Sequence, residues 1–485
     1  MKILHKFILT AVISLLINAA TAQNHPQKKS EDTIDRFVKK MMKHYQIPGC
    51  AIAILKDNTV IKLKGYGLAS IEFNVPVTTK TKFLLDSQTK LFTAIALMKL
   101  QELGVITLDD PINKYLDSIP ASWHNVTIRN LLTHSSGIRD NYVPDYGTGV
   151  SLMEYTQEQL YHQAINQPLD FKTGDNISYN NLGFFLATII IEKVTHLPYQ
   201  DYMTNEFFGP LGLTNISFAP QEDVVSNYAT AYTLKNNRIV HMRDYAISQQ
   251  GFSYMMKSSV EDLAKFSVLF NNEKVISKRS IDEMRKLFIT NDNLCKIEQR
   301  FGAGFIGLAY EIWFVDGHTA YSKTGGAGTI YMQIPDLHLT VIILSNREHY
   351  DKVGMATVLA RLAAPALKNN SEGHAQSKNE DSLLTKQMKS TFIHCLSAEN
   401  DSGRLKPVFF SFFPHQYDER NVVQQLKSFR YAGEYEMNDR TLVLYGSHAD
   451  KVIVYNAKLA DLDLLVYFYL SDDGKILFAD AEINP

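Results

Sequence analysis

A serine three residues ahead of a lysine, Ser87 and Lys90, stands where a polar stretch enters the apolar segment 91–98. A serine hydroxyl is a weak nucleophile at neutral pH and needs a neighbouring base, which a desolvated amine can be. At a spacing of three, two helical residues lie on one face, so the Lys90 amine can reach the Ser87 hydroxyl. The pair indicates acyl transfer through Ser87, although a polar start to a buried helix can contain the same two residues.

A second polar motif, Ser178-Tyr179-Asn180-Asn181, precedes a strongly apolar segment. The Tyr179 phenol can share the proton transfer, because nearby ammonium groups stabilise its ionised form and lower its pKa. Asn181 can hold a substrate amide. The structural alternative is a helix cap with a packed tyrosine ring.

A third motif, Lys323-Thr324-Gly325-Gly326, lies in a region of β-branched and aromatic residues. Its glycines let a substrate approach the backbone closely. Lys323 and Thr324 offer an ammonium and a hydroxyl donor, which would form charge-assisted hydrogen bonds to a substrate carboxylate. The structural alternative is a solvated end of a strand.

These three motifs, in this order, resemble the set found in the serine β-lactamase and D-alanyl-D-alanine peptidase superfamily of penicillin-recognising enzymes. The resemblance is to the class C-like branch of β-lactamase-related serine hydrolases, and it runs from about Asp32 to about Leu362. The segments 131–138 and 209–213 also look like parts of that branch. The resemblance implies a β-lactamase/transpeptidase-like fold, a secreted serine hydrolase, and neither a metal nor another cofactor.

The resemblance also implies roles for individual residues. Ser87 would be the nucleophile, with Lys90 and Tyr179 as the other catalytic residues. The backbone amides of Ser87 and Gly326 would form the oxyanion hole. The implied substrate-binding residues are Asn181, Lys323, Thr324 and Gly325.

His134 offers a rival arrangement, because it stands beside Ser135 and Ser136. A catalytic Ser-His pair would need a positioned acid and a nucleophile elbow around the serine. No acid is visibly positioned, and no Gly-x-Ser-x-Gly motif is present there. In the resembling family this stretch is a structural turn.

The motifs leave the substrate open. Peptidase, β-lactamase and esterase reactions share these reacting groups and differ in the loops that shape the pocket. A small molecule or a peptide is the expected substrate. The alternative from another class is a catalytically poor binding or sensor protein that keeps the fold.

The composition limits partners and compartment. A net charge of −2 over 485 residues argues against nucleic acid, which requires a concentrated basic surface. The N-terminus has a basic start, an apolar run over residues 7–17 and Ala20-Thr21-Ala22, which predicts a signal peptide at 1–22 and a secreted or periplasmic protein. A membrane anchor is the alternative, but the run is shorter than the ~20 residues that span a bilayer, and no integral membrane segment is expected after signal removal.

Three widely separated cysteines, Cys50, Cys295 and Cys395, do not form a disulfide framework or a metal motif. We expect them to be small buried hydrophobic residues.

The elements that must position these motifs predict an α/β (α+β) fold. Residues 31–45 have helical periodicity, and two strands flank Asp57-Asn58 as a hairpin. Further helices are expected from residue 87 to near Gly104 and over 181–194, with strands within 301–314 and 329–344 and a helix at 353–362. The expected result is an antiparallel sheet flanked by helices, built from both ends of the unit, with a helical insert.

The expected domains are the hydrolase at 30–366, a polar linker at 367–382 and a small antiparallel β module at 383–485. The strands expected in the module are 431–436, 441–445, 451–455, 464–470 and 475–479.

Overall fold

The computed structural model of the chain describes residues 32–140, 156–218, 224–242, 256–292, 305–315, 318–364, 385–386, 388–390, 426–436, 443–444, 447–448, 451–458, 463–471, 473–474 and 476–483. The expected signal peptide at 1–22 and linker at 367–382 lie outside these residues, as do Cys295 and Cys395. The domain boundary therefore stays a prediction.

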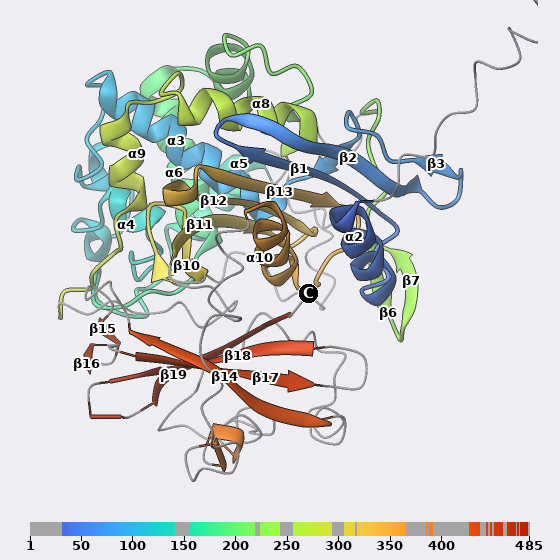
Figure 1. Cartoon of the computed structure of the whole chain (residues 1–485). Coiled ribbons are helices and arrows are strands. Elements are labelled where there is room, and N and C mark those ends of the chain that lie inside the picture. The colour runs from blue at the N-terminus through green and yellow to red at the C-terminus, as the bar shows by residue number, and fades with distance from the viewer. Residues whose placement is uncertain are drawn as a thin grey trace, which may run out of the picture. The chain divides into compact units, whose positions relative to one another are not determined.

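An eight-stranded antiparallel sheet forms the centre of the region expected to be a hydrolase domain (Figure 1). The hairpin of β1 and β2 is confirmed, and both turn residues, Asp57 and Asn58, have φ near +55°, at 52° and 59°. Such left-handed turns match the twist of the two strands. β1 also pairs with β13, so the sheet joins both ends of the region, as expected. In spatial order, the strands are β3 (Val75–Pro76), β2 (Thr59–Ser70), β1 (Gly49–Lys56), β13 (Leu339–Ser345), β12 (Thr329–Ile334), β11 (His318–Gly325), β10 (Glu311–Val315) and β9 (Phe305–Ile306).

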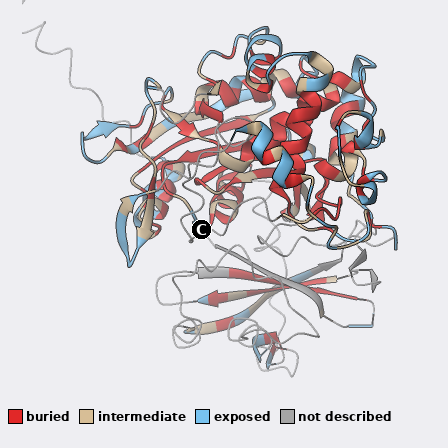
Figure 2. Ribbon diagram, turned by 180° about the vertical axis from the view of Figure 1, so that it is seen from behind, coloured by how far each residue is buried: buried red, intermediate tan, exposed pale blue. Residues whose placement is uncertain are grey.

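Helices cover both faces of this sheet. α8 (Val260–Asn271) packs on β1 and β13, and α10 (Lys352–Ala363) packs on β12 and β13 from the opposite side (Figure 1). Every residue of β12 and β13 is buried, which requires cover on both faces. Figure 2 shows the same burial in the central strands and the helices beside them.

The helical insert contains two apolar helices that position the motifs. Eleven of the 14 residues of α3 (Thr89–Glu102) are buried, and α6 (Asn181–Thr195) packs against it. A helix that is apolar all round is stable only inside a core. The other helical elements are α2 (Thr33–His44), α4 (Ile128–Leu132), α5 (Gln157–Ala164), α7 (Tyr199–Asp201), the π-helix η5 (Tyr202–Phe208), α9 (Lys278–Arg285) and the 3₁₀ turns η1 (Asp86–Gln88), η2 (Ile112–Lys114), η3 (Ala121–Trp123) and η6 (Pro335–Leu337).

Two small sheets accompany the insert. β4 (Lys82–Leu84) and β5 (Ser217–Phe218) pair with β8 (Met256–Ser259), and β6 (Tyr232–Lys235) pairs with β7 (Arg238–His241). β4 leads directly into η1, so this sheet fixes the position of Ser87.

The C-terminal module is antiparallel β structure, as expected. Its main sheet has the order β14 (Ser428–Glu436), β17 (Lys451–Lys458), β18 (Asp463–Leu470) and β19 (Ile476–Ile483), and β15 (Val443–Leu444) pairs with β16 (Ser447–His448). The Tyr455 ring packs between Phe429 and Phe468, with ring centroids 4.6 and 5.8 Å away. These contacts give the sheet an aromatic core of its own.

Candidate active site

Ser87 lies in η1, a single 3₁₀ turn between β4 and α3, rather than inside the long helix itself. Two hydrogen bonds hold this turn against β12 and the residues before it. Thr329 Oγ1 donates to the Leu85 carbonyl at 3.0 Å, and the Ala327 amide donates to the Asp86 carboxylate at 3.0 Å. The start of α3 is therefore fixed relative to the third motif.

Ser87, Lys90 and Tyr179 meet at one oxygen atom. Lys90 Nζ donates to Ser87 Oγ at 3.1 Å, and the Tyr179 hydroxyl donates to the same oxygen at 2.8 Å. Tyr179 precedes α6 and is 92 residues away in sequence, so α3 and α6 must pack together to form the arrangement. All three expected catalytic residues are brought together.

The Lys90 side chain is fully buried in the first turn of α3. Burial, followed by the positive charge of Lys323, lowers its pKa to about 7, although the carboxylates of Asp86, Asp140 and Glu311 act in the opposite direction. A substantial fraction of Lys90 is therefore a neutral amine near neutral pH. Such an amine can accept a proton from Ser87.

The Tyr179 ring has a cation against it from two elements. Lys90 Nζ is 5.2 Å from its ring centroid, and Lys323 Nζ is 5.3 Å away. His134 stacks on the same ring at 4.5 Å. These contacts determine where the phenol hydroxyl points, and the expected lowering of the Tyr179 pKa stays a prediction.

His134 has a backbone partner that explains its orientation. Its Nδ1 accepts from the Asn180 amide at 3.1 Å, so a neutral ring has its proton on Nε2. Burial, followed by the charges of Lys323 and Lys90, holds the His134 pKa well below its usual range. The neutral ring supports Tyr179, which agrees with a structural turn rather than a Ser-His pair.

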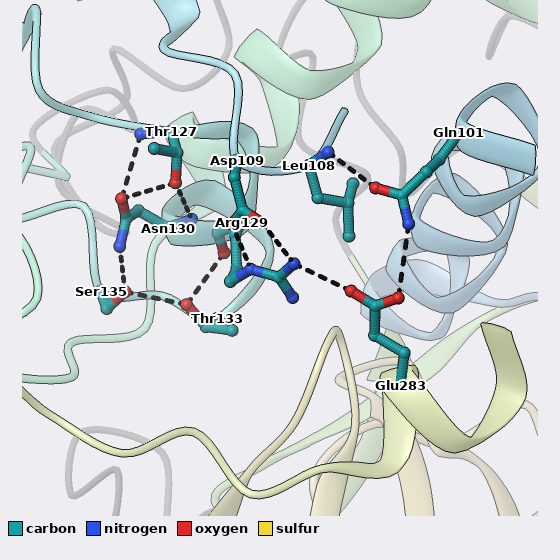
Figure 3. A network of polar contacts seen from close by, with 9 residues as sticks. All are labelled: Gln101, Leu108, Asp109, Thr127, Arg129, Asn130, Thr133, Ser135 and Glu283. Carbon is teal, nitrogen blue, oxygen red and sulfur yellow. Dashed lines mark hydrogen bonds and ion pairs between the residues drawn. The ribbon is translucent and has the colours of Figure 1, made fainter. Parts of the chain in front are cut away.

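Ser135 belongs to a polar network that builds this turn, drawn in Figure 3. Its Oγ accepts from Asn130 at 3.0 Å and lies 2.8 Å from the Thr133 hydroxyl. Asn130 and Thr127 form a capping box at the start of α4, and Arg129 bonds both Asp109 and Glu283. The Ser135 hydroxyl is therefore occupied in positioning α4. The network consists of Gln101, Leu108, Asp109, Thr127, Arg129, Asn130, Thr133, Ser135 and Glu283.

The two asparagines after Tyr179 have different partners. Asn180 caps α6 by accepting from the Gly183 amide at 2.7 Å, as the structural alternative proposed. Asn181 donates to the Asp140 carboxylate at 3.5 Å. Its contact with a substrate stays a prediction, and the motif combines a helix cap with a phenol that reaches Ser87.

The glycines of the third motif make room for the protein itself. A Cβ on Gly325 would lie 2.1 Å from the Leu85 carbonyl oxygen, and one on Gly326 would lie 2.5 Å from the Asp86 carboxylate. Position 325 requires glycine because the near atom belongs to the backbone, whereas a side chain at position 326 would have to displace the Asp86 carboxylate. The two residues expected to form the oxyanion hole, Ser87 and Gly326, thus lie on adjoining segments.

Lys323 and Thr324 are bound by an acidic residue that no sequence motif indicated. Glu311 of β10 accepts from Lys323 Nζ at 3.0 Å, from Thr324 Oγ1 at 3.0 Å and from the Thr324 amide at 3.2 Å. The side chains of Lys323 and Glu311 are 2% and 6% exposed. The alternative prediction of a solvated strand end is therefore wrong, and the side chains of Lys323 and Thr324 already have an internal acceptor.

A weak signal for Glu311 exists in the sequence. It is a single carboxylate in an otherwise apolar run from Ala309 to Val315. A buried carboxylate needs an ionic or hydrogen-bonding partner, so this residue called for a cation on a neighbouring strand.

Within the part of the chain that the structure describes, no group of three or more His, Cys, Asp or Glu residues is arranged to hold a metal ion. None of the helices in that part is long and apolar enough to cross a bilayer. Cys50 is a free, buried thiol, as expected.

Comparisons with known proteins agree with this architecture. The family model described as Beta-lactamase matches residues 34–364. Protein flp of Staphylococcus aureus is 28% identical over 239 residues, 48% of this chain and 47% of that protein. A Beta-lactamase of Providencia stuartii is 29% identical over 238 residues, 49% of this chain and 59% of that protein. The chain spans about half the length of the curated relatives it matches.

Solved structures share the fold. The octameric penicillin-binding protein homologue from Pyrococcus abyssi has a TM-score of 0.60 and 26% identity, and the match covers 92% of this chain and 97% of that one. This match extends beyond residues 34–364. The hydrolase EstCE1, described as having promiscuous acyltransferase activity, has a TM-score of 0.56 and 21% identity, covering 65% of this chain and 93% of that one.

Proposed function

Because the chain belongs to the Beta-lactamase family, we propose that it is a secreted or periplasmic serine hydrolase that forms an acyl-enzyme at Ser87. The observation behind this proposal is the convergence of Lys90 Nζ and the Tyr179 hydroxyl on Ser87 Oγ, at 3.1 and 2.8 Å. The bond it hydrolyses is an amide, a β-lactam or an ester. The proposed compartment rests on the basic and apolar pattern of the N-terminus.

In the proposed reaction, Lys90 and Tyr179 accept and return a proton in both acylation and deacylation. Ser87 Oγ attacks the carbonyl carbon while its proton passes to the pair formed by Lys90 and Tyr179. The amides of Ser87 and Gly326 stabilise the negative charge on the carbonyl oxygen. The pair then passes this proton to the leaving group as its bond to the carbonyl carbon breaks. A water molecule next attacks the acyl carbon and gives a proton to the same pair, which returns a proton to Ser87 Oγ as the carboxylic acid leaves.

The buried side chain of Lys90 and the nearby Lys323 support proton transfer near neutral pH. A Lys90 pKa of about 7 keeps the amine partly neutral, whereas an exposed lysine would be almost entirely protonated. Lys323 remains close to the Tyr179 ring and supplies positive charge beside the reacting groups.

Active-site labelling followed by turnover tests this proposal. The protein beginning at Gln23 is treated with a fluorophosphonate and then assayed on nitrocefin, D-Ala-D-Ala peptides and nitrophenyl esters. Labelling and turnover are expected in the wild type, with loss of labelling and about 10³-fold or greater loss of turnover in Ser87→Ala.

Ser135→Ala is the matched control, because it removes another buried hydroxyl outside the proposed machinery. It should keep labelling, with turnover within a few-fold of wild type. Labelling that survives in Ser87→Ala but disappears in Ser135→Ala would reject Ser87 as the nucleophile. Labelling of Ser87 without turnover of any substrate would favour the binding or sensor alternative.

A further inference from the structure

The cation of the third motif is already paired with a carboxylate inside the protein. Glu311 Oε1 accepts from both Lys323 Nζ and Thr324 Oγ1 at 3.0 Å. Its Oε2 accepts from the Thr324 amide at 3.2 Å. One carboxylate thus uses the two side-chain donors that the motif would otherwise present to a substrate.

The strand register holds Glu311 in this position. Glu311 pairs with Ser322 in the antiparallel ladder of β10 and β11, next to Lys323 and Thr324. The Ser322 hydroxyl accepts from Trp313 Nε1 at 2.9 Å, so the same two strands are also joined by side chains. Glu311 is 5% exposed, and leaving this contact would place an ionised carboxylate in a buried environment without its cation.

We propose that Glu311 is a specificity-determining residue that directs the site toward acyl substrates without a carboxylate beside Lys323 and Thr324. The proposal rests on the hydrolase function proposed above and narrows its substrate class to neutral esters and amides. It reverses the expectation that the third motif binds a substrate carboxylate.

Electrostatics gives the reason. A substrate carboxylate bound to the Lys323 ammonium would lie within about 4–6 Å of Glu311, the range in which like charges disfavour each other's ionised form. It would also have to share donors that Glu311 already uses. A neutral group at the same place has neither cost, so the discrimination acts against the charge of the substrate and not against its size.

Two substrates that differ by one charge test this inference. They are 3-carboxyphenyl phenylacetate and its methyl ester, which have the same acyl group and the same scissile bond. We expect wild-type kcat/KM to be about tenfold higher for the methyl ester, a difference of about 1.4 kcal/mol. A wild type that prefers the free acid would overturn the proposal without any variant.

Glu311→Gln provides the matched change. The glutamine keeps the shape and an oxygen acceptor for Lys323 and Thr324 but removes the negative charge, so the preference for the methyl ester should disappear or reverse. Glu311→Asp keeps the charge and should retain the preference for the methyl ester. An acid-to-ester ratio that is the same in wild type and Glu311→Gln would show that Glu311 only holds the strands together.

The outcomes separate the two proposals. The ratio compares two substrates on one protein, so it is independent of the amount of folded enzyme, and fluorophosphonate labelling gives the folded fraction of each variant. Failure to label Ser87 and to hydrolyse either ester rejects the hydrolase function. Hydrolysis of both esters with a preference for the acid rejects only the role of Glu311.

Discussion

Lys90 and Lys323 are two buried lysines at nearly equal distances from the same ring, yet their surroundings differ. Their Nζ atoms lie 5.2 and 5.3 Å from the centroid of Tyr179. Lys90 donates to the neutral hydroxyl of Ser87, whereas Lys323 donates to the carboxylate of Glu311. Two buried lysines beside one ring therefore differ in their hydrogen-bond acceptor, which is a hydroxyl for Lys90 and a carboxylate for Lys323.

Lys323 also acts on Lys90. The charge of Lys323 is, after burial, the largest cause of the lowered Lys90 pKa. A cation kept beside Glu311 can thus help to make its neighbour a neutral amine. In the proposed reaction, Lys90 is the residue for proton transfer, and Lys323 is held by Glu311 beside it.

The largest expected effect comes from giving position 90 a permanent positive charge. An arginine at position 90 keeps the cation but cannot lose its proton in a protein. Lys90→Arg should therefore lower kcat by about 10³-fold or more. Wild-type kcat/KM should rise with pH through about 7 as the Lys90 amine becomes neutral.

A pH–rate profile between pH 5 and 9 provides the measurement, with Lys80→Arg as the control because Lys80 is exposed. A Lys90→Arg enzyme with the wild-type rate and profile would show that the base is another group.

Removing the phenol that both lysines approach should have the next largest effect. Tyr179→Phe keeps the ring, its cation contacts and its stack on His134, but removes the hydroxyl that donates to Ser87. We expect kcat to fall by about 10²-fold or more with little change in KM, because the hydroxyl acts in the transition state. Steady-state kinetics on a nitrophenyl ester tests this, and a wild-type kcat would mean that Tyr179 only packs.

Replacing each lysine by methionine should have different effects on the free energy of unfolding. Lys323→Met leaves Glu311 buried without its cation and should lower the free energy of unfolding by about 3–5 kcal/mol. The folded-state pKa of Lys90 lies below the ordinary lysine pKa of 10.5, which applies to the unfolded chain. The contribution of Lys90 to stability therefore increases as pH rises from about 7 toward 10.5.

Lys90→Met should therefore be relatively most favourable below pH 7, where it removes a buried charge. Urea unfolding of both variants at pH 6 and 9 makes the comparison. Equal destabilisation by Lys90→Met and Lys323→Met at pH 6 would contradict it.

The smallest expected effect is a shift in the Lys90 titration. The Glu311 charge raises the Lys90 pKa slightly, so its removal in Glu311→Gln should move the acidic limb of the pH–rate profile to lower pH. The shift should be small, since Glu311 comes after burial, Lys323, Asp86 and Asp140 among the causes that set the Lys90 pKa. Glu311→Asp should leave the limb near its wild-type position, and a shift to higher pH in Glu311→Gln would contradict the sign.

Local patterns were sufficient for the elements that position the site. The turn pair Asp57-Asn58 predicted the hairpin, because both residues tolerate left-handed backbone angles. The apolar runs after Ser87 and after Asn180 predicted α3 and α6, and such runs are stable only when buried. The order of three short motifs was enough to group Ser87, Lys90 and Tyr179.

Contacts between distant segments decided the rest. Glu311 reaches Lys323 only through the register of β10 and β11, and His134 reaches Tyr179 only because a turn places its ring there. Packing also gives Gly325 a role that the sequence did not indicate, since its missing side chain admits the Leu85 carbonyl, and the approach of a substrate stays a prediction. Sequence patterns report which residue types are present and at what spacing. Which acceptor holds each buried charge depends on packing across the sheet, and here that acceptor distinguishes Lys90 from Lys323.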